Sequence, residues 1–486
     1  MNKVLKIVFI GILLLLIFPA TQKYFSIFKI TPLNGAFVKV EKPVFIWNKW
    51  LSGEFQSKYN QYLEENIGFR NFFVRLHNQI DYSLFRKANA EGVVVGKNDY
   101  LFEEDYIYEY LGDFFIGKEA INKKLERVKF LQDTLKKKDI ELIIVIEPGK
   151  ASFFPEYIPE KYDVSKKSLS NYEYYVQRSN ELGINILDLN KCFKLMKDTS
   201  KYPLYPKSGI HWSVYGMTCA VDTLLKYIEN IHEIDVPDIY CDSIDLSDSM
   251  RLTDYDLGNT MNLLWKIPQP QMAYPNLRFE NNPEKTKPAV LAIGDSYYLS
   301  ILAQGIPKNI FSNEPFWYYN KNIYPESYTK SKIVDEINLK EEIEKQDVIL
   351  LMITERFFHC FMWGFVENAY KIYNPDYTKD NIYNYENRIR FYDKRFKKIF
   401  SEAKKENISL EEMILKNAEH QFYTAFKKSK NKSKEDHIKY IEWVIRNDEK
   451  WLNSIKKTAK EKNLDLDKLI TDNAEWMYNE KIKKKN

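Results

Sequence analysis

The sequence predicts an α/β protein of three layers, in which a mostly parallel β-sheet lies between two layers of helices. Four near-continuous apolar runs, each following a helical segment, are typical of strands that are buried on both faces of a sheet. The chain has 486 residues, of which 44% are hydrophobic, so it can bury a sizeable core and form two or three domains. The expected architecture also includes an N-terminal membrane anchor and an all-α C-terminal repeat region.

The four apolar runs define the expected sheet, and a helix precedes the first of them. Apolar residues recur at three- and four-residue steps from Ile121 to Leu135, as on one face of an amphipathic helix. The strand sequences that follow are ELIIVIEPGK (141–150), GINILDLN (183–190), KPAVLAIGDS (287–296) and QDVILLMITER (346–356). Parallel sheets place their working residues just beyond the carboxyl ends of the strands. The polar residues found there are Lys150, Asp295, Ser296, Glu355 and Arg356.

The N-terminus has the layout of an export signal. Lys3 and Lys6 precede an uncharged apolar run over residues 7–20. The run is short for a spanning helix, yet no convincing small-x-small cleavage site follows it. A helix buried in the protein would normally carry a polar face, which this segment lacks. We therefore predict a retained signal anchor over residues 1–28, in place of a cleaved peptide, and a protein that leaves the cytoplasm but stays anchored in a membrane.

The rest of the chain divides into a main domain and a tail. Residues 40–375 form the expected catalytic domain; its lead-in mixes aromatic and charged residues at helical spacing, and residues 92–112 resemble short strands around a turn. In the tail, residues 376–486, the segment 394–422 is repeated at 450–478. Ser409 and Asp465 occupy equivalent positions and are suited to cap helices, and Glu412 would complete a capping box with Ser409. The repeat predicts a helical unit that either binds a partner or packs on the main domain.

Charge and cysteine content exclude several function classes. The net charge is +4, from 72 basic and 68 acidic residues, so nothing indicates a field that would capture nucleic acid. The four cysteines, Cys192, Cys219, Cys241 and Cys360, form no Cys-x-x-Cys pair, which argues against a zinc or redox motif. We expect buried, small apolar side chains at these positions, with one disulfide as the alternative, and no metal or cofactor.

Ser296 and His211 are the candidate catalytic pair. Gly294, Asp295 and Ser296 lie between an apolar strand and an expected helix, where backbone N–H groups can stabilise an oxyanion. Gly-Asp-Ser alone is a weak signal, because these residues also form ordinary loops and caps. A serine nucleophile needs a base, which is usually histidine. Of the six histidines, only His211 lies in a loop-like segment rich in Gly and Pro, so the two motifs strengthen each other.

These motifs together resemble the alginate O-acetyltransferase accessory proteins, the DHHW family of the SGNH-hydrolase-like superfamily. The resemblance covers most of residues 45–360. It rests on ENIGFR, VVVGKNDYLF, VIEPGKASFFPEYIP, ILDLN, the His-Trp box followed by Tyr-Gly, IGDSYY and ITERFF, with the His box ahead of the Ser box as in that family. It implies that Ser296 is an acetyl-accepting nucleophile and His211 its base. It also implies a polysaccharide acceptor and a membrane-bound O-acyltransferase as the acetyl source. With the predicted anchor, it further implies a protein held in the inner membrane and facing the periplasm.

The sequence departs from this family at Gly209. Family members usually show Asp-x-His, and glycine stands at the Asp position here. Removal of the aspartate that orients the histidine lowers turnover by about 10⁴-fold in serine proteases, so another group must orient His211 or the site is slow. Ser208, Asp295 and Glu355 are the candidates from the sequence, and a backbone carbonyl is a further option.

Two other functions stay open, and several residues have alternative roles. The glycine and the repeated tail also suit an inactive binding or assembly subunit, and a site that admits water would make the protein a carbohydrate deacetylase. Trp212, Tyr297, Trp317 and the tyrosine pairs at 297–298 and 318–319 are candidates for stacking on a sugar, although aromatic residues in this composition also suit packing. Lys150 and Arg356 either steer an anionic polymer or form ion pairs at the strand ends.

Overall fold

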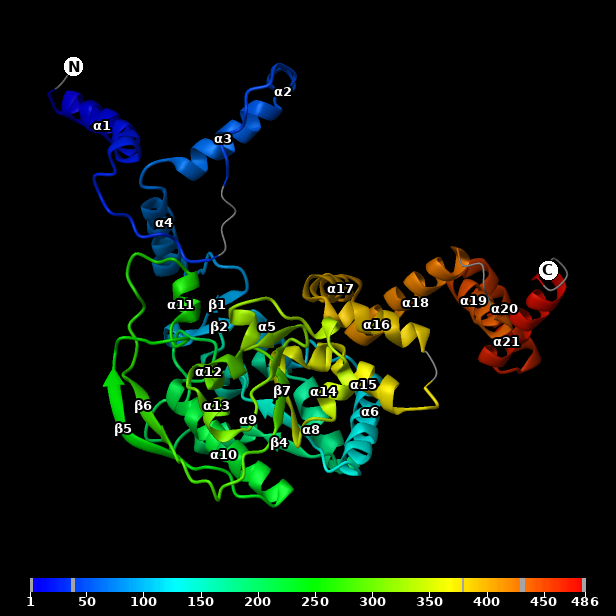
Figure 1. Ribbon diagram of the computed structural model, residues 1–486. Helices are drawn as coiled ribbons and strands as arrows, with labels where there is room; N and C mark the ends of the chain where they lie inside the picture. The colour runs from blue at the N-terminus through cyan, green and yellow to red at the C-terminus, as the bar shows by residue number, and fades with distance from the viewer. Residues whose placement is uncertain (1–2, 36–39, 378–379, 429–432, 483–486) are drawn as a thin grey trace. The chain divides into compact units, whose positions relative to one another are not determined.

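The computed structural model describes residues 3–35, 40–377, 380–428 and 433–482 (Figure 1). The chain divides into two compact units, Met1–Pro375 and Asp376–Asn486. The first two residues of the expected anchor and the last four residues of the tail lie outside the described residues.

A six-stranded sheet forms the centre of the first unit, in the order β4-β3-β10-β7-β8-β9. All four predicted strands are present and lie next to one another in parallel: β3 (Glu141–Glu147), β4 (Ile186–Asp188), β7 (Val290–Gly294) and β10 (Val348–Thr354). The sheet continues through β8 (Phe316–Tyr318), parallel to β7, and β9 (Asn322–Tyr324), antiparallel to β8. The predicted α/β class with a mostly parallel sheet is therefore confirmed.

The register aligns the carboxyl ends of the central strands. Val348 of β10 pairs with Glu141 of β3 and with Val290 of β7, so the three strands run level from their first residues. Every residue of β3, β7 and β10 is buried, as expected for strands with a helical layer on each face. The segments that follow these strands consequently meet at one edge of the sheet.

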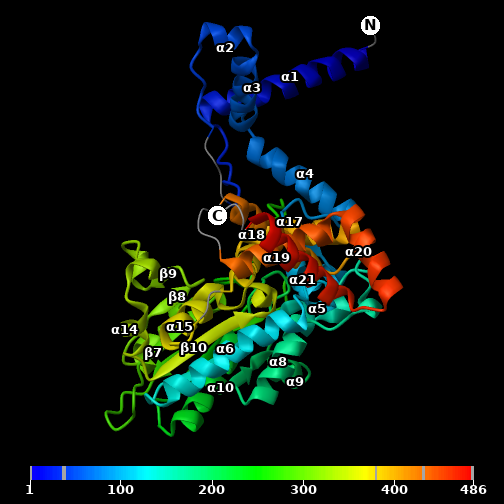
Figure 2. The ribbon, with the colours of Figure 1, turned by 90° about the vertical axis from the view of Figure 1, so that its right-hand side faces the viewer.

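Helices cover both faces of the sheet. On one face, α6 (Lys118–Lys136), α8 (Asn171–Leu182) and α15 (Phe365–Tyr373) pack on one another (Figure 2). On the other face, one core cluster joins alternate residues of β3, β7 and β10 to α9 (Leu189–Met196), α10 (Val214–His232), α12 (Tyr297–Ala303) and α13 (Ile306–Ile310). The predicted helix over 121–135 is thus α6, whose Leu125, Val128 and Leu131 are fully buried.

Two antiparallel hairpins flank the sheet. The first joins β1 (Val93–Val95) to β2 (Leu101–Glu103), as the sequence predicted. The second joins β5 (Ile239–Ser247) to β6 (Met272–Phe279), and the sequence analysis did not anticipate it. Its long connection, residues 248–271, carries the short helix α11 (Asp256–Thr260). Smaller helices are α5 (Glu104–Leu111), α7 (Lys150–Phe153) and α14 (Leu339–Ile343).

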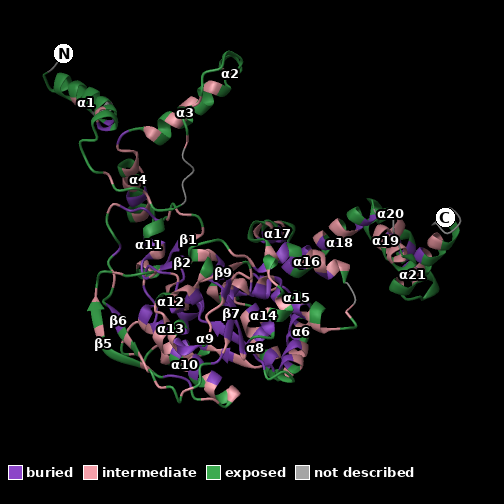
Figure 3. Cartoon of the chain, viewed as in Figure 1, coloured by how far each residue is buried: buried purple, intermediate pink, exposed green. Residues whose placement is uncertain are grey.

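The N-terminal region consists of α1 (Lys3–Phe25), α2 (Trp47–Leu51), α3 (Glu54–Asn66) and α4 (Arg70–Phe85). Helix α1 is long and apolar enough to cross a membrane: its 18-residue window has a mean hydropathy of 2.6 and is 6% buried. Most of its described side chains are exposed (Figure 3). A helix of 23 residues spans roughly 34 Å, which is close to the thickness of a bilayer core, about 30 Å. The finding fits either an anchor or a signal sequence.

The second unit is helical among its described residues. Its helices are α16 (Asn381–Phe391), α17 (Asp393–Glu406), α18 (Leu410–Lys428), α19 (Lys434–Asn447), α20 (Glu449–Lys462) and α21 (Leu466–Met477). The two copies of the sequence repeat correspond to α17–α18 and α20–α21. In each, an asparagine with positive φ, Asn407 at 54° or Asn463 at 50°, ends the first helix. Ser409 and Asp465 then accept hydrogen bonds from Glu412 N and Lys468 N, as expected of caps.

The cysteines are all free thiols. Only Cys360 is buried, whereas Cys192 and Cys219 are partly exposed and Cys241 is exposed. The expectation that all four are buried apolar side chains is therefore correct for Cys360 alone.

Candidate active site

Ser296 lies directly beyond the carboxyl end of β7, ahead of α12. The close packing of β7 against β10 leaves no room for a side chain at Gly294, where a Cβ atom would lie 2.9 Å from the carbonyl oxygen of Met352. His211 precedes α10, whose first turn is capped by Ser213 through its bond from Gly216 N. The Nε2 atom of His211 lies 2.8 Å from Ser296 Oγ. The structure thus brings together the two residues that the sequence paired, 85 positions apart.

Asp256 is the third member of this arrangement, and the sequence analysis missed it. Its Oδ2 atom lies 2.8 Å from His211 Nδ1. Its Oδ1 atom accepts hydrogen bonds from the backbone N–H groups of Ile210 and Leu257, at 2.9 and 2.6 Å. These donors fix the carboxylate in place. Ser296, His211 and Asp256 therefore have the connectivity of a Ser-His-Asp triad, in which the acid sets the tautomer and direction of the imidazole.

Gly209 explains how Asp256 reaches the histidine. A Cβ atom at position 209 would lie 2.5 Å from the carbonyl oxygen of Thr253 and 2.7 Å from Pro206 Cγ. Only glycine leaves space for residues 253–254 to cross this close to the His211 loop. Position 209, where the resembled family has its aspartate, is thus the position whose missing side chain lets Asp256 approach from another segment.

The three orienting groups proposed from the sequence lie elsewhere. Ser208 Oγ accepts a hydrogen bond from Gln269 Nε2 at 2.7 Å. Asp295 accepts from Thr354 N and Oγ1, and from Tyr297 N, and so holds the turn that carries Ser296. Glu355 accepts from Ser152 Oγ and Asn190 Nδ2 beneath Gly149. Asp295 and Glu355 follow strand ends and Ser208 is close to His211 in sequence, but neither position fixes which group faces the imidazole, and each of the three has other partners.

A buried carboxyl pair lies beneath the nucleophile turn. Glu147, the last residue of β3, is fully buried and neighbours Asp295. Burial and the neighbouring Asp295 carboxylate hold the pKa of Glu147 well above its ordinary value. Two adjacent carboxylates in a buried site disfavour each other's ionised form, so both burial and Asp295 favour the protonated form of Glu147.

Lys150 supports the His211 loop from below. Only 1% of its surface is exposed, so it does not face a polymer. Its Nζ donates to the carbonyl oxygens of Lys207 at 2.9 Å and Gly209 at 2.5 Å. Burial lowers the pKa of this amine to about 7. Lys150 therefore ties α7 to the segment that leads into His211.

Arg356 forms ion pairs, the second of the two roles considered for it. Its guanidinium contacts Glu103 and lies 3.3 Å from Asp105. These contacts join the end of β10 to β2 and α5. Arg356 therefore has a structural role.

The two predicted stacking residues are buried and present no face to a sugar. Trp212 is 1% exposed and donates its indole N–H to Ser300 Oγ. Tyr297 is also 1% exposed; its hydroxyl donates to the carbonyl of Ile210 and lies 3.0 Å from Tyr205 Oη. Both residues act in packing, and Tyr297 additionally holds the residue before His211.

A different aromatic cluster stands at the same sheet edge. Tyr319, Phe357 and Trp363 are partly exposed, and their ring centroids lie 5.0–5.4 Å apart. Tyr319 N donates to the carbonyl of Gly294, two residues before Ser296. Tyr319 and Trp363 have positive φ values of 52° and 46°, a strained state that tends to persist at functional sites. Tyr319 belongs to the tyrosine pair at 318–319 that the sequence offered as a stacking candidate, whereas nothing in the sequence distinguished Phe357 or Trp363 from other aromatic residues.

No group of three or more His, Cys, Asp or Glu side chains that could hold a metal ion occurs in the part of the chain that the structure describes. The site is built from a hydroxyl, an imidazole and a carboxylate. These three groups together suit acyl transfer through a covalent intermediate.

Comparison with known proteins points to the same kind of chemistry, acyl transfer. Residues 93–237 match the SGNH hydrolase-like domain of the acetyltransferase AlgX. The matched segment contains His211, whereas Asp256 and Ser296 follow it. The chain is also 24% identical over 188 residues to the probable alginate O-acetylase AlgJ of Pseudomonas aeruginosa, covering 38% of this chain and 46% of the relative. The resemblance predicted from the motifs is thereby confirmed.

Other relatives and solved structures extend the comparison. The alginate biosynthesis protein AlgX of Pseudomonas syringae pv. tomato is 26% identical over 147 residues, 29% of this chain and 28% of the relative. The chain thus spans less than half the length of the curated relatives it matches. The O-acetyltransferase domain of Pseudomonas putida AlgJ aligns with a TM-score of 0.37 and 16% identity, covering 55% of this chain and 92% of that one. Bacillus cereus PatB1 aligns with a TM-score of 0.36 and 10% identity, covering 55% and 97%.

Proposed function

We propose that this protein is a membrane-anchored O-acetyltransferase that transfers acetyl groups through Ser296 to hydroxyls of a cell-surface or secreted polysaccharide. The observation that supports this most is the chain of two 2.8 Å contacts from Asp256 through His211 to Ser296. It removes the main sequence-based objection to activity, because the aspartate missing at position 209 is supplied from α11.

In the first half-reaction, Ser296 Oγ attacks the acetyl carbonyl of a donor ester or thioester while His211 Nε2 takes the hydroxyl proton. The donor's C–O or C–S bond then breaks, and its leaving group receives that proton from His211. Asp256 stabilises the imidazolium and keeps the second imidazole proton on Nδ1. The backbone N–H of Ser296, ahead of α12, is the proposed donor to the oxyanion.

In the second half-reaction, a sugar hydroxyl replaces the donor. His211 Nε2 takes the proton of that hydroxyl as its oxygen attacks the acetyl-serine carbonyl. The bond to Ser296 Oγ then breaks, and His211 returns the proton to the serine. The protein is unchanged and one ester has moved from donor to acceptor.

The partly exposed aromatic cluster is the proposed platform for the acceptor. Tyr319, Phe357 and Trp363 lie beyond the ends of β8 and β10, at the same edge as Ser296. Partly exposed rings can pack against the apolar face of a sugar. This assignment replaces Trp212 and Tyr297, which are buried.

The N-terminal helix is the proposed anchor. It would hold the catalytic unit at the periplasmic face of the inner membrane, where a membrane-bound O-acyltransferase supplies acetyl groups. The exposure of α1 and its length support this placement. Helix α1, with 23 residues, is the one candidate span among the described residues, and the proposal assigns delivery of the acetyl group to another protein.

Intact-mass spectrometry of the protein after incubation with a chromogenic acetyl ester tests the proposal. We expect wild type to gain the mass of one acetyl group and Ser296→Ala to gain none. No adduct and no ester turnover in either protein would refute the catalytic proposal in favour of a binding subunit. Release of acetate with no acetylated glycan, in the presence of polysaccharide, would instead identify a deacetylase.

A further inference from the structure

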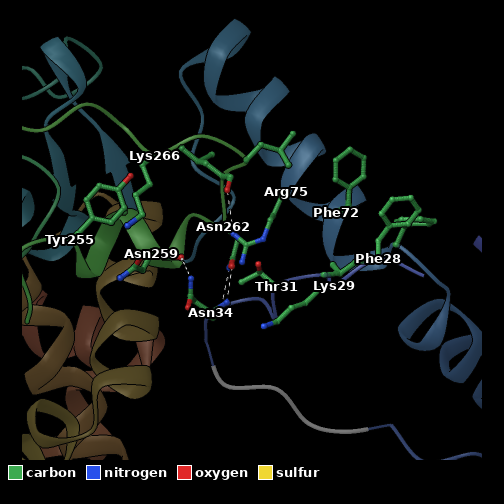
Figure 4. A pocket seen from close by; sticks show the side chains of 15 residues that line it. Phe28, Lys29, Thr31, Asn34, Phe72, Arg75, Tyr255, Asn259, Asn262 and Lys266 are labelled. Atoms are coloured by element: carbon green, nitrogen blue, oxygen red, sulfur yellow. Dashed lines mark hydrogen bonds between the residues drawn. The ribbon is translucent and has the colours of Figure 1, made fainter. Parts of the chain in front are cut away.

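A cationic cavity lies beside the end of α1, away from the residues that contact Ser296. It has a volume of about 640 Å³ and is bordered by the segment after α1, by α4, and by α11 with the loop that follows it (Figure 4). Three of its lining residues are basic: Lys29, Arg75 and Lys266. None of its fifteen lining residues is Asp or Glu. The cavity therefore concentrates positive charge from three separate segments.

The charge of Arg75 is not neutralised by a carboxylate. Its guanidinium donates to two backbone carbonyls, Leu263 at 3.2 Å and Pro32 at 2.7 Å, and its buried Nε has no acceptor. Among the described residues, no salt bridge is recorded for Lys29, Arg75 or Lys266. Carbonyl acceptors position a guanidinium while leaving its positive charge available to an anion.

The remaining lining is apolar and aromatic. Phe28, Phe69 and Phe72 form part of the wall, and Phe28 and Phe72 are 53% and 42% exposed. A cavity that combines cations with exposed aromatic rings is suited to a molecule with an anionic group next to an apolar part. A small inorganic anion would leave most of this surface unused.

The cavity is fixed to the end of the proposed anchor. Phe69 lines it and stacks on Phe18 of α1, with ring centroids 4.9 Å apart. Gln22 exchanges two hydrogen bonds with the backbone of Phe28, only three residues beyond the end of α1. A chain of three residues reaches about 10 Å at most. If α1 spans a bilayer, the cavity therefore lies at the level of the lipid headgroups.

We propose that this cavity binds the headgroup of an anionic phospholipid at the outer face of the inner membrane. The phosphate would lie among Lys29, Arg75 and Lys266, and the acyl chains would follow the exposed rings toward α1. The inference rests on the anchoring part of the proposed function, although it requires no catalysis. A free phosphate ester has the same charged group and lacks the apolar part, so the two are distinguishable.

The opposite wall links this site to the triad. Asn34, in the segment after α1, exchanges hydrogen bonds with Asn262 and donates to the carbonyl of Asn259. Asn259 belongs to α11, whose first residue is Asp256. A bound headgroup would therefore hold in place the same helix that supplies the carboxylate to His211.

The test uses the full chain in detergent and native mass spectrometry. Phosphatidylglycerol is titrated against phosphatidylcholine with the same acyl chains, with glycerol phosphate and an oligouronate in parallel. We expect one phosphatidylglycerol to bind at least tenfold more tightly than phosphatidylcholine, and glycerol phosphate to bind weakly. The double variant Lys29→Gln, Lys266→Gln should lose roughly 30-fold in phosphatidylglycerol affinity, because each basic residue contributes about fivefold at an anionic surface.

The matched control removes the same charge outside the cavity. Lys42→Gln with Lys58→Gln changes two exposed lysines of the lead-in and should retain wild-type affinity. An equal loss in both double variants would overturn the proposal, since the attraction would then be general. Tighter binding of the oligouronate, lost only in the cavity variant, would also overturn it and assign the cavity to a glycan. Lipid binding is measured without turnover, so it can also be measured with the Ser296→Ala protein. Lipid binding by this inactive variant would show that the lipid proposal and the catalytic proposal can fail independently.

Discussion

Replacement of Asp256 by asparagine isolates the role of the carboxylate that His211 faces. Asp256 Oδ1 is held by two backbone N–H groups, at 2.9 and 2.6 Å, and an asparagine would keep its carbonyl oxygen there. Its amide N–H would then point at His211 Nδ1, which can accept only in the tautomer that carries its proton on Nε2. That proton faces Ser296 Oγ, so His211 could not take the serine proton.

The expected loss follows from this tautomer change. The corresponding substitution in a serine protease lowers turnover by about 10⁴-fold, equivalent to about 5 kcal/mol of activation free energy. We expect the rate of acetyl-Ser296 formation, followed by intact mass in a single turnover, to fall by a factor of this order. Thermal denaturation should show little change, because the shape of the side chain and its backbone bonds are retained.

Asp254→Asn is the matched control for this experiment. Asp254 is buried, lies two residues away and accepts from Tyr274 Oη at 2.8 Å, and burial raises its pKa to about 6. In the described part of the chain Asp254 is not hydrogen-bonded to His211, so its variant should retain activity within about tenfold. An Asp256→Asn protein that acetylates within tenfold of wild type, while Ser296→Ala does not, would show that another group orients His211.

Three further changes test other parts of the site. Gly209→Ala should lower stability by about 1–3 kcal/mol and slow acylation, because the new Cβ would lie 2.5 Å from Thr253 O; unchanged melting and acylation would contradict the close approach. Burial lowers the pKa of Lys150 from 10.5 to about 7, so between these two pH values the unfolded chain binds more protons than the folded chain. The unfolding free energy of wild type, measured relative to Lys150→Met, should therefore rise by up to about 1.4 kcal/mol per pH unit in this range. Urea denaturation across this range would show a constant difference if the amine were not buried. Trp363→Ala should raise KM for the polysaccharide roughly fivefold, from the loss of about 1 kcal/mol of ring contact, with turnover of a small acetyl ester unchanged; an equal loss for both substrates would indicate damage to the site itself.

Local sequence pattern was sufficient for the four central parallel strands and for the pairing of Ser296 with His211, but it did not reveal β8 and β9 at the edge of the sheet. Strands that are buried on both faces must be apolar throughout, so β3, β4, β7 and β10 were visible as runs. The nucleophile was visible because it follows such a run directly, and the repeated tail because equal spacing requires no knowledge of the fold.

The identity of the acid and the orientation of the aromatic side chains depended on the tertiary structure. Asp256 lies 45 positions after His211, in the connection of a hairpin that no pattern in the sequence had indicated, and it reaches the imidazole only because position 209 lacks a side chain. Trp212 and Tyr297 are aromatic residues of the kind that stack on sugars, but packing on the sheet buries both. Tyr319, Phe357 and Trp363 instead remain partly exposed. Hydrogen bonds and burial are set by which segments meet in space, whereas sequence periodicity reports only which face of each element is apolar.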